Sequence, residues 1–246
     1  MKFSVFQLSR IGGRKKNEDR AGYTYTQGAA IFLVADGLGG HPAGEVASQL
    51  GLQVVMSMFH EQAKPRLHDV PAFMRDAMMA AHQNLVAYAM GHSMIDTPST
   101  TMVIAIIQDH QVYVGHCGDS RLYLVRDQEV FMQTTDHSML MREAAAGDGA
   151  GSSRHTLYNC LGASNAPFVD VSDPAPLHFR DRLLLCSDGL WGSVGEPDIV
   201  DWMSRHNVSD GSAGLMELAL QRGGAHGDNA TLIAVSWEEP DNAELS

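Results

Sequence analysis

Four aspartates lie where apolar stretches of the chain begin or end. Asp36 and Asp188 each follow an apolar run and precede a glycine, Asp119 follows a third run, and Asp228 precedes a fourth. One Asp-Gly pair after a strand indicates only a turn. The four together predict a common site, because the end of one antiparallel strand lies beside the start of its neighbour, so that these aspartates can converge on one sheet edge.

Carboxylates that converge repel one another unless a cation neutralises them. Mg²⁺ and Mn²⁺ are hard cations that bind oxygen ligands. The sequence has no histidine or thiolate cluster at zinc spacing, which makes zinc the weaker interpretation. The residue types therefore predict a site for divalent cations such as Mg²⁺ or Mn²⁺.

The segment from Arg14 to Asp19 places a basic residue close to two carboxylates, Glu18 and Asp19. By itself such a segment is typical of a solvated, charged loop. Beside a cation site, however, the Arg14 guanidinium would be suited to bind two phosphate oxygens at once. Glu18 and Asp19 could then hold waters bound to the cations.

Apolar periodicity predicts the strands and helices that would position these residues. The predicted strands cover residues 3–8, 21–26, 29–35, 101–108, 111–116, 121–126, 129–132, 182–187 and 230–237. The predicted helices cover residues 42–59, 70–88, 139–145, 197–205 and 212–222. Because strands and helices occur in blocks and not in strict alternation, we expect an α+β sandwich with mainly antiparallel sheets.

Local signals support these boundaries. Asp69 can cap the second helix, and Pro71 is tolerated in its first turn. Asp109-His110 and Asp127-Gln128 separate predicted strands and are typical of tight turns in an antiparallel meander. Gly223-Gly224 is a suitable end for the last helix.

Composition narrows the class of protein. A chain of 246 residues suits one domain over residues 1–246. The net charge of −12, from 17 basic and 29 acidic residues, leaves no excess of Lys or Arg for binding nucleic acid. The three cysteines form no CxxC pair and indicate free thiols in a reducing compartment. With neither a signal-peptide core nor a membrane-spanning apolar run, we expect no membrane contact and a cytoplasmic location.

Taken in order along the chain, these motifs give it a resemblance to one family. The chain resembles the metal-dependent protein phosphatases, the type 2C serine/threonine phosphatases, in their short bacterial form. The matching motifs follow the family's order and span nearly the whole chain. They are Arg14-x-x-Asn17-Glu18-Asp19, Val34-Ala35-Asp36-Gly37-Leu38-Gly39-Gly40, Ser99-Thr100-Thr101, Gly118-Asp119-Ser120-Arg121, Asp136-His137-Ser138, Leu185-Cys186-Ser187-Asp188-Gly189-Leu190 and Gly227-Asp228-Asn229.

The resemblance implies an α-β-β-α sandwich, two mainly antiparallel sheets flanked by helices, with a binuclear Mn²⁺ or Mg²⁺ site at one edge. By the family pattern, Asp36 would bridge both cations, and the backbone carbonyl of Gly37 would bind one of them. Asp188 and Asp228 would bind the other cation, and Glu18 would act through water.

Further roles also follow from the resemblance. Asp119, together with Asp188, matches residues that hold a weaker third cation in bacterial members, and Arg14 matches the phosphate-binding arginine. A water between two cations would attack phosphorus in line with the leaving seryl or threonyl oxygen. Two positions depart from the pattern: Leu38 stands where many eukaryotic members have a histidine proposed as general acid, and Gly192 where relatives often have an aspartate.

The resemblance implies a phosphatase that acts on phosphoserine and phosphothreonine in proteins, and it is consistent with a partner kinase that the enzyme opposes. We expect a monomer, since no long coiled-coil heptad pattern occurs. The glycine-rich stretch 147–153 predicts a flap-like segment at about 138–165. Two alternatives stay open: a pseudophosphatase that serves as a binding module, and a phosphatase of anti-sigma-factor antagonists.

Overall fold

Two antiparallel sheets stack on each other in a computed structural model of the chain, which describes residues 1–38, 43–138 and 156–239. The first sheet has the strand order β1-β11-β10-β6-β7. Its strands are β1 (Phe3–Arg10), β11 (Ala230–Trp237), β10 (Arg182–Cys186), β6 (Arg121–Arg126) and β7 (Glu129–Gln133).

The second sheet has the order β2-β3-β4-β5-β8, and β9 also pairs with β5. Its strands are β2 (Asp19–Tyr25), β3 (Ala29–Asp36), β4 (Met102–Gln108), β5 (Gln111–Cys117), β8 (Asp170–Val171) and β9 (Ala175–Pro176). The strand pairs of both sheets are antiparallel in the described residues, as the blocks of strands in the sequence predicted.

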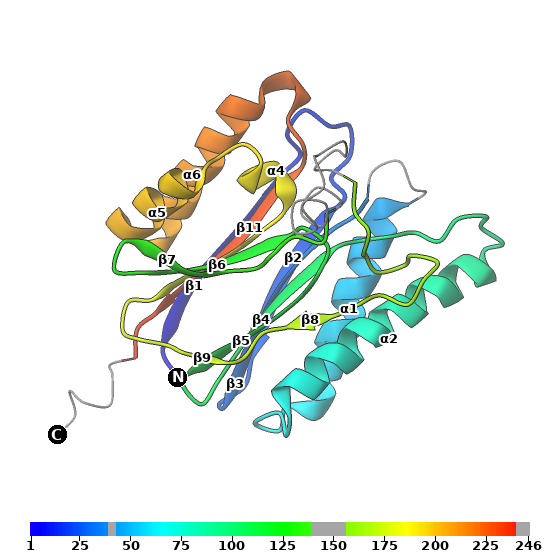
Figure 1. Ribbon diagram of the computed structural model, residues 1–246, viewed down its shortest axis with the longest axis horizontal. Coiled ribbons are helices and arrows are strands. Elements are labelled where there is room, and N and C mark those ends of the chain that lie inside the picture. The colour runs from blue at the N-terminus through cyan, green and yellow to red at the C-terminus, as the bar shows by residue number, and fades with distance from the viewer. Residues whose placement is uncertain (39–42, 139–155, 240–246) are drawn as a thin grey trace, which may run out of the picture.

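Helices cover both outer faces of the sandwich (Figure 1). The long helices α1 (Gly44–Gln62) and α2 (Val70–Gly91) lie on the second sheet. The first sheet carries α4 (Asp188–Trp191), α5 (Glu196–Arg205) and α6 (Val208–Gly223), and the 3₁₀ turn η1 (Gly224–His226) follows α6. The predicted α-β-β-α sandwich is confirmed.

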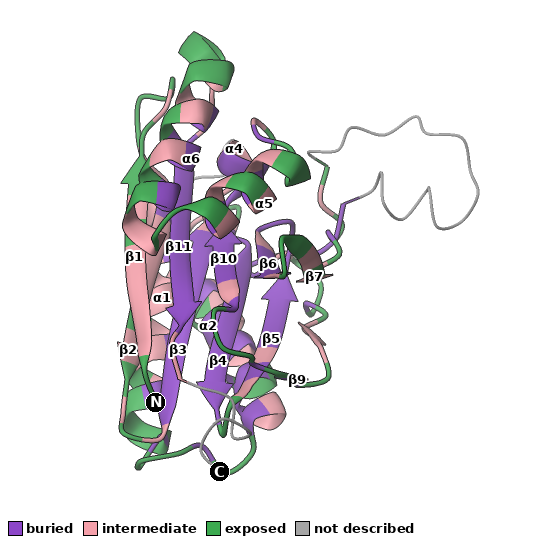
Figure 2. Cartoon of the chain, turned by 90° about the vertical axis from the view of Figure 1, so that its left-hand side faces the viewer, coloured by how far each residue is buried: buried purple, intermediate pink, exposed green. Residues whose placement is uncertain are grey.

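Strand β3 explains how the core is organised. Its seven residues before Asp36 are fully buried, which is why this part of the sequence reads as a continuous apolar run. Side chains alternate along the strand. Leu33 therefore packs under α1 and α2, whereas Phe32 packs between the two sheets. Figure 2 shows these buried strands enclosed by helices whose outer faces are exposed. Burial of each large apolar side chain stabilises the fold by about 1.5–3 kcal/mol. Strand β3 is therefore firmly held in the core, and it supports the carboxylate at its end.

The local sequence signals were accurate. The Asp69 side chain caps α2 by accepting the N–H of Ala72 at 2.9 Å. The paired turn residues Asp109-His110 and Asp127-Gln128 all have positive φ, as two-residue hairpin turns of type I′ require. Helix α6 ends at Gly223, as predicted.

Some elements of the structure were not predicted from the sequence, and some predicted elements lie outside the described residues. The sequence did not predict β8 and β9, because two residues are too few for a periodic pattern. It also gave a turn at Asp188, where the short helix α4 begins. The predicted helix at 139–145, the start of the first helix at 42 and most of the predicted flap lie outside the described residues. Among the described residues, no helix is both long and apolar enough to span a membrane.

Candidate metal and phosphate site

One cavity of about 650 Å³ is lined by the predicted site residues except Asp19, which is buried beneath it. These residues are Arg14, Glu18, Asp36, Gly37, Asp119, Asp188 and Asp228. Asp36 ends β3, Asp119 follows β5, Asp188 opens α4 directly after β10, and Asp228 precedes β11. The strand ends therefore bring together residues that are up to 214 positions apart in sequence.

Two threonines directly before β4 fix the end of β3. The carbonyl of Asp36 accepts hydrogen bonds from the Thr101 N–H and from the Thr100 hydroxyl, each at 2.8 Å. The Asp36 N–H donates to the Thr101 hydroxyl oxygen at 3.2 Å. The motif Ser99-Thr100-Thr101 thus holds the backbone that carries the central aspartate.

Negative charge is concentrated around Asp36. Burial raises the pKa of Asp36 well above its usual value, and the nearby carboxylates of Asp19, Asp188 and Asp119 raise this pKa further. Burial also raises the pKa of Asp119, and Asp188 again adds to the effect. A bound cation would stabilise the ionised forms of these carboxylates, which otherwise repel one another.

Asp19 gives a direct test of whether a cation would fit here. The residue is only 2% exposed, and one carboxylate oxygen accepts the Ser187 hydroxyl at 2.7 Å. The other oxygen, Oδ1, is buried and has no hydrogen-bond partner among the described residues. A buried polar atom without a partner costs about 1–3 kcal/mol. The donor set of carboxylates beside such an oxygen suits a hard divalent cation that keeps bound waters.

Gly37 is required by the close approach of α1. A Cβ at this position would lie 2.2 Å from the carbonyl oxygen of Gly44, so a larger residue would displace the helix start or the loop. Gly37 N–H also donates to the Glu18 carbonyl at 3.2 Å. The backbone at Gly37 is therefore held beside Glu18 at the wall of the cavity.

Asn229 fastens the segment that carries Arg14 and Glu18. Its amide oxygen accepts the Glu18 N–H at 2.8 Å. Its amide nitrogen donates to the carbonyls of Ile11 and Lys16, also at 2.8 Å each. The sequence showed Asn229 only as a motif residue, and its role as a clamp between β11 and this segment depends on long-range contacts.

Arg14 and Asp228 form an ion pair at the open side of the cavity. The Arg14 Nη2 lies 2.5 Å from Asp228 Oδ2, and the two side chains are 52% and 37% exposed. An exposed ion pair contributes only about 0–1 kcal/mol. The guanidinium can therefore exchange this carboxylate for another anion at little cost.

Close packing and hydrogen bonds hold the loop that carries Asp119. Gly118 has φ +110, and a Cβ there would lie 2.6 Å from Thr101 Cβ. The Trp191 indole N–H donates to the Asp119 carbonyl at 2.9 Å. Arg121 makes two hydrogen bonds with Asp136, at 2.8 and 2.7 Å, and its guanidinium carbon lies 3.5 Å from the Trp191 ring centre.

The cavity also has lining residues that the sequence did not single out as site residues. They include Leu157, Ser193, Arg222 and His226. Leu38 and Gly192 line the cavity as well, so neither departure from the family pattern adds an acid or a carboxylate there. No motif pointed to His226, because its place at the cavity depends on the turn η1.

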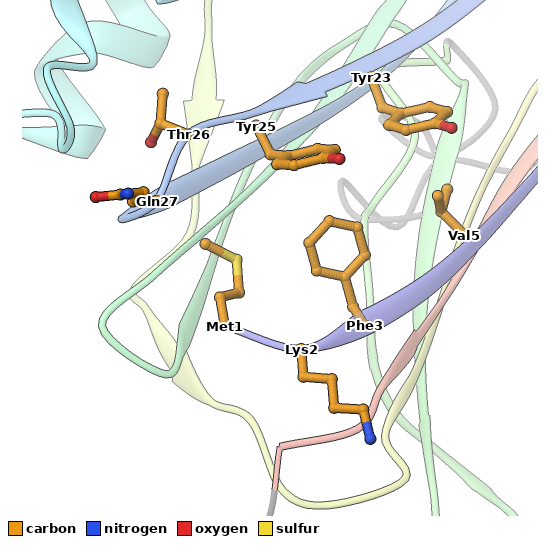
Figure 3. A pocket seen from close by; sticks show the side chains of 8 residues that line it. All are labelled: Met1, Lys2, Phe3, Val5, Tyr23, Tyr25, Thr26 and Gln27. Carbon is orange, nitrogen blue, oxygen red and sulfur yellow. The ribbon is translucent and has the colours of Figure 1, made fainter.

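A second open pocket, of about 780 Å³, lies between the start of β1 and the end of β2 (Figure 3). Its lining includes Phe3, Val5, Tyr23 and Tyr25 but no carboxylate. Asp19 and Tyr25 are the first and last residues of β2, which places this pocket at the opposite end of that strand from Asp19. Lys2 is its one charged side chain, so the pocket lacks the carboxylate ligands that a cation site needs.

A sandwich whose strand ends gather carboxylates around an open cavity with an arginine defines a metal-dependent phosphoester hydrolase. The family model for protein phosphatase 2C matches residues 7–143. The serine/threonine phosphatase stp of Listeria welshimeri is 31% identical over 239 residues, which cover 94% of each chain. The chain belongs to the protein phosphatase 2C family, and it is a protein serine/threonine phosphatase.

Solved structures agree with this assignment. The serine/threonine phosphatase Stp1 from Staphylococcus aureus has a TM-score of 0.88 at 28% identity, covering 97% of this chain and 96% of that one. The catalytic domain of the phosphatase PstP, solved in complex with two manganese ions, has a TM-score of 0.80 at 28% identity. That match covers 96% of this chain and 99% of the PstP chain.

Proposed function

We propose that the 650 Å³ cavity is the active site and holds two divalent cations, Mn²⁺ or Mg²⁺. Asp36 would bridge them, the Gly37 carbonyl would bind one, and Asp188 and Asp228 would bind the other. Glu18 would act through water. The unpartnered Oδ1 of buried Asp19, beside mutually repelling carboxylates, is the observation that carries this proposal.

A third, weaker cation site would involve Asp119 and Asp188. Asp119 lines the same cavity and is 4% exposed, so the ionised form of its carboxyl group would need a positive partner. Gly192 supplies no side-chain ligand to this site, and we therefore expect it to fill only at higher cation concentration.

The chemistry follows from these positions. When bound, divalent cations lower the pKa of a coordinated water and offset charge on phosphoryl oxygens. Arg14 leaves its exposed partner Asp228 and binds two oxygens of the substrate phosphate, which orients phosphorus for in-line attack. Asp228 is then available to the cations.

The leaving oxygen needs a proton that Leu38 is unable to donate. Among the described lining residues, His226 is an imidazole that could give this proton, and water in the open cavity is the other source. No covalent enzyme intermediate is required, since the nucleophile is water.

The substrates are phosphorylated proteins. The related phosphatases from Listeria and Staphylococcus are named serine/threonine phosphatases, which supports phosphoserine and phosphothreonine as the substrate groups. We further propose that the enzyme opposes a bacterial serine/threonine kinase and acts as a monomer in the cytoplasm. The full set of aspartates makes a pseudophosphatase the weaker alternative, and an anti-sigma-factor antagonist is a narrower substrate of the same chemistry.

Hydrolysis of para-nitrophenyl phosphate and of a phosphothreonine peptide tests the proposal. We expect activity with Mn²⁺, loss of activity with chelator, and recovery when Mn²⁺ is restored. Activity that survives complete chelation would rule out the metal mechanism. Cation binding without any turnover would favour the pseudophosphatase.

A further inference from the structure

Two stacked histidines lie outside the cavity lining. The rings of His116 and His137 are 4.5 Å apart at an interplanar angle of 21°, and both residues are 4% exposed. One side-chain nitrogen of each lies within 4.8 Å of an Asp170 carboxylate oxygen. Two histidines and a carboxylate are a common ligand set for transition metals, so a second cation site is the first interpretation to consider.

The hydrogen bonds around His137 oppose that interpretation. Its Nδ1 faces two N–H donors, the Gly118 backbone at 3.2 Å and the Asn159 amide nitrogen at 2.7 Å. The orientation of Asn159 is fixed, because its nitrogen donates to the Phe168 carbonyl at 2.7 Å and its oxygen accepts the Phe168 N–H at 3.0 Å. Nδ1 must therefore be the acceptor, and the proton of the neutral ring lies on Nε2.

A protonated nitrogen has no lone pair for a metal. Binding a cation at Nε2 would move the proton to Nδ1, where it would face the N–H groups of Gly118 and Asn159. His116 Nε2 is likewise a donor, since its partner at 2.8 Å is the Thr135 carbonyl, and only its Nδ1 has a lone pair to offer. The cluster is therefore a hydrogen-bonded assembly and not a cation site.

His137 binds both polar backbone groups of Gly118. Besides the contact at Nδ1, the His137 N–H donates to the Gly118 carbonyl at 3.0 Å. Gly118 directly precedes Asp119 and has a left-handed backbone. The His137 carbonyl also accepts the Tyr158 N–H at 3.1 Å, so this residue joins the Asp119 loop to residues 158–159.

We propose that His137, as a neutral imidazole with its proton on Nε2, is a positioning residue that fixes the Gly118 peptide and directs Asp119 into the active-site cavity. This inference rests on the proposed role of Asp119 in binding a cation. Burial lowers the pKa of His137 to about 4, which is consistent with a neutral ring at the pH of the cytoplasm. The residue touches neither substrate nor cation, and it acts through the loop.

Two substitutions at His137 separate its hydrogen bond from its bulk. His137→Leu removes the acceptor, whereas His137→Asn keeps an oxygen acceptor at about the place of Nδ1. In His137→Leu we expect the Mn²⁺ concentration for half-maximal activity on a phosphothreonine peptide to rise by about 10-fold, as for other residues that orient ligands. In His137→Asn the Mn²⁺ concentration for half-maximal activity should stay within about 3-fold of wild type, because the acceptor for the Gly118 N–H is kept.

His116→Leu is the matched control, because it removes an equally buried ring whose hydrogen bond goes to the Thr135 carbonyl and not to Gly118. We expect its Mn²⁺ requirement to equal that of wild type. An equal rise in His116→Leu, or no rescue by His137→Asn, would overturn the proposal. If His137→Leu does not fold, Asn159→Asp replaces it in the experiment. The carboxylate oxygen would face Nδ1 of His137 and draw the ring proton to that nitrogen, so the Mn²⁺ requirement should rise. An unchanged Mn²⁺ requirement in Asn159→Asp would contradict the proposal.

Asp119→Asn distinguishes this inference from the proposed function. If Asp119→Asn leaves the Mn²⁺ requirement unchanged, the assignment of Asp119 is wrong and the positioning role falls with it. If Asp119→Asn raises the requirement and His137→Leu does not, only the positioning role is wrong.

The tautomer itself can be measured. Long-range ¹H–¹⁵N spectra of the histidine-labelled protein should show His137 protonated at Nε2 with Nδ1 unprotonated, and the signals should not change on titration with Zn²⁺. Protonation at Nδ1 would contradict the proposal. Stoichiometric Zn²⁺ binding that is lost in both His116→Leu and His137→Leu would replace it with a metal site.

Discussion

At the scale of single residues, the central property of the site is that its carboxylates destabilise one another until cations arrive. Burial and the neighbouring aspartates raise the pKa of Asp36. The site therefore costs folding free energy in the metal-free protein. Cation binding recovers that free energy, because ligands that bind only the folded state stabilise it.

Replacement of Asp36 with Asn should separate stability from function. We expect Asp36→Asn to raise the melting temperature in chelator, since it removes a carboxyl group whose ionised form is disfavoured by burial and by the neighbouring carboxylates, and to abolish activity. The increase in melting temperature caused by Mn²⁺ should be smaller in Asp36→Asn than in wild type. Thermal melting with and without Mn²⁺ measures both effects. Asp181→Asn is the control: the Asp181 carboxylate is buried but paired with Arg126 at 2.9 and 2.6 Å, so removing its charge should cost about 3–5 kcal/mol of stability.

The same charges make the stability of the metal-free protein depend on pH. Burial, as the largest cause, raises the pKa of Asp19 to about 7 and that of Asp119 to about 8. The folded state thus holds protons that the unfolded state releases near pH 4. Stability should fall as pH rises from about 4 to about 8. Urea unfolding in chelator tests this; a stability that rises across that range would contradict it.

Mn²⁺ should reverse this dependence. Cation ligands must lose their protons, so binding strengthens as pH rises. The increase in melting temperature caused by Mn²⁺ should therefore be larger at pH 8 than at pH 5.5.

Arg14 should act on the substrate and not on the cations. We expect Arg14→Ala to lower kcat/KM by about 10- to 100-fold, the value of a lost charge-assisted pair of hydrogen bonds, mainly through KM. Mn²⁺ affinity should be largely unchanged, because the ion pair with Asp228 is exposed. Steady-state kinetics and Mn²⁺ titration measure the two quantities, and a loss of Mn²⁺ binding would show that Arg14 has a structural role.

At the scale of elements, the site depends on loops that are held by side chains from distant strands. Asn229→Asp keeps the acceptor for the Glu18 N–H but loses both donors to Ile11 and Lys16. We expect a loss of about 1–3 kcal/mol of stability and a weaker response to Mn²⁺. Asn84→Asp, on an exposed face of α2, should change stability by less than about 0.5 kcal/mol. Equal effects of the two substitutions would refute the clamp.

The elements also explain what sequence reasoning could reach. Long periodic segments such as α2 and β3 were predictable, because burial on one or both faces imposes the apolar pattern. The convergence of aspartates was predictable from antiparallel strand ends. The roles of Asn229 and His137 could not be predicted from the sequence, because each depends on hydrogen-bond partners more than 18 residues away. His226 was missed because it lies in the short turn η1, which carries no motif or periodic pattern.

At the scale of the whole molecule, the sandwich converts separate motifs into one site. The middle of each central strand is buried in the core, whereas the strand ends and the loops that follow them line the cavity. Substrate access through an open cavity suits phosphate groups on protein surfaces. Because the net charge of the chain is −12, the bound cations, Arg14 and Arg222 would supply the local positive charge that attracts a phosphate group to the cavity.

The most direct test of this account is to count bound Mn²⁺ while measuring activity. Equilibrium dialysis of wild type and Asp36→Asn against graded Mn²⁺ should be paired with phosphothreonine-peptide hydrolysis at each concentration. We predict two tightly bound Mn²⁺ per wild-type chain, activity that rises with their occupancy, and loss of both in Asp36→Asn. Full activity at less than one bound Mn²⁺ per chain, or unchanged binding in Asp36→Asn, would contradict it.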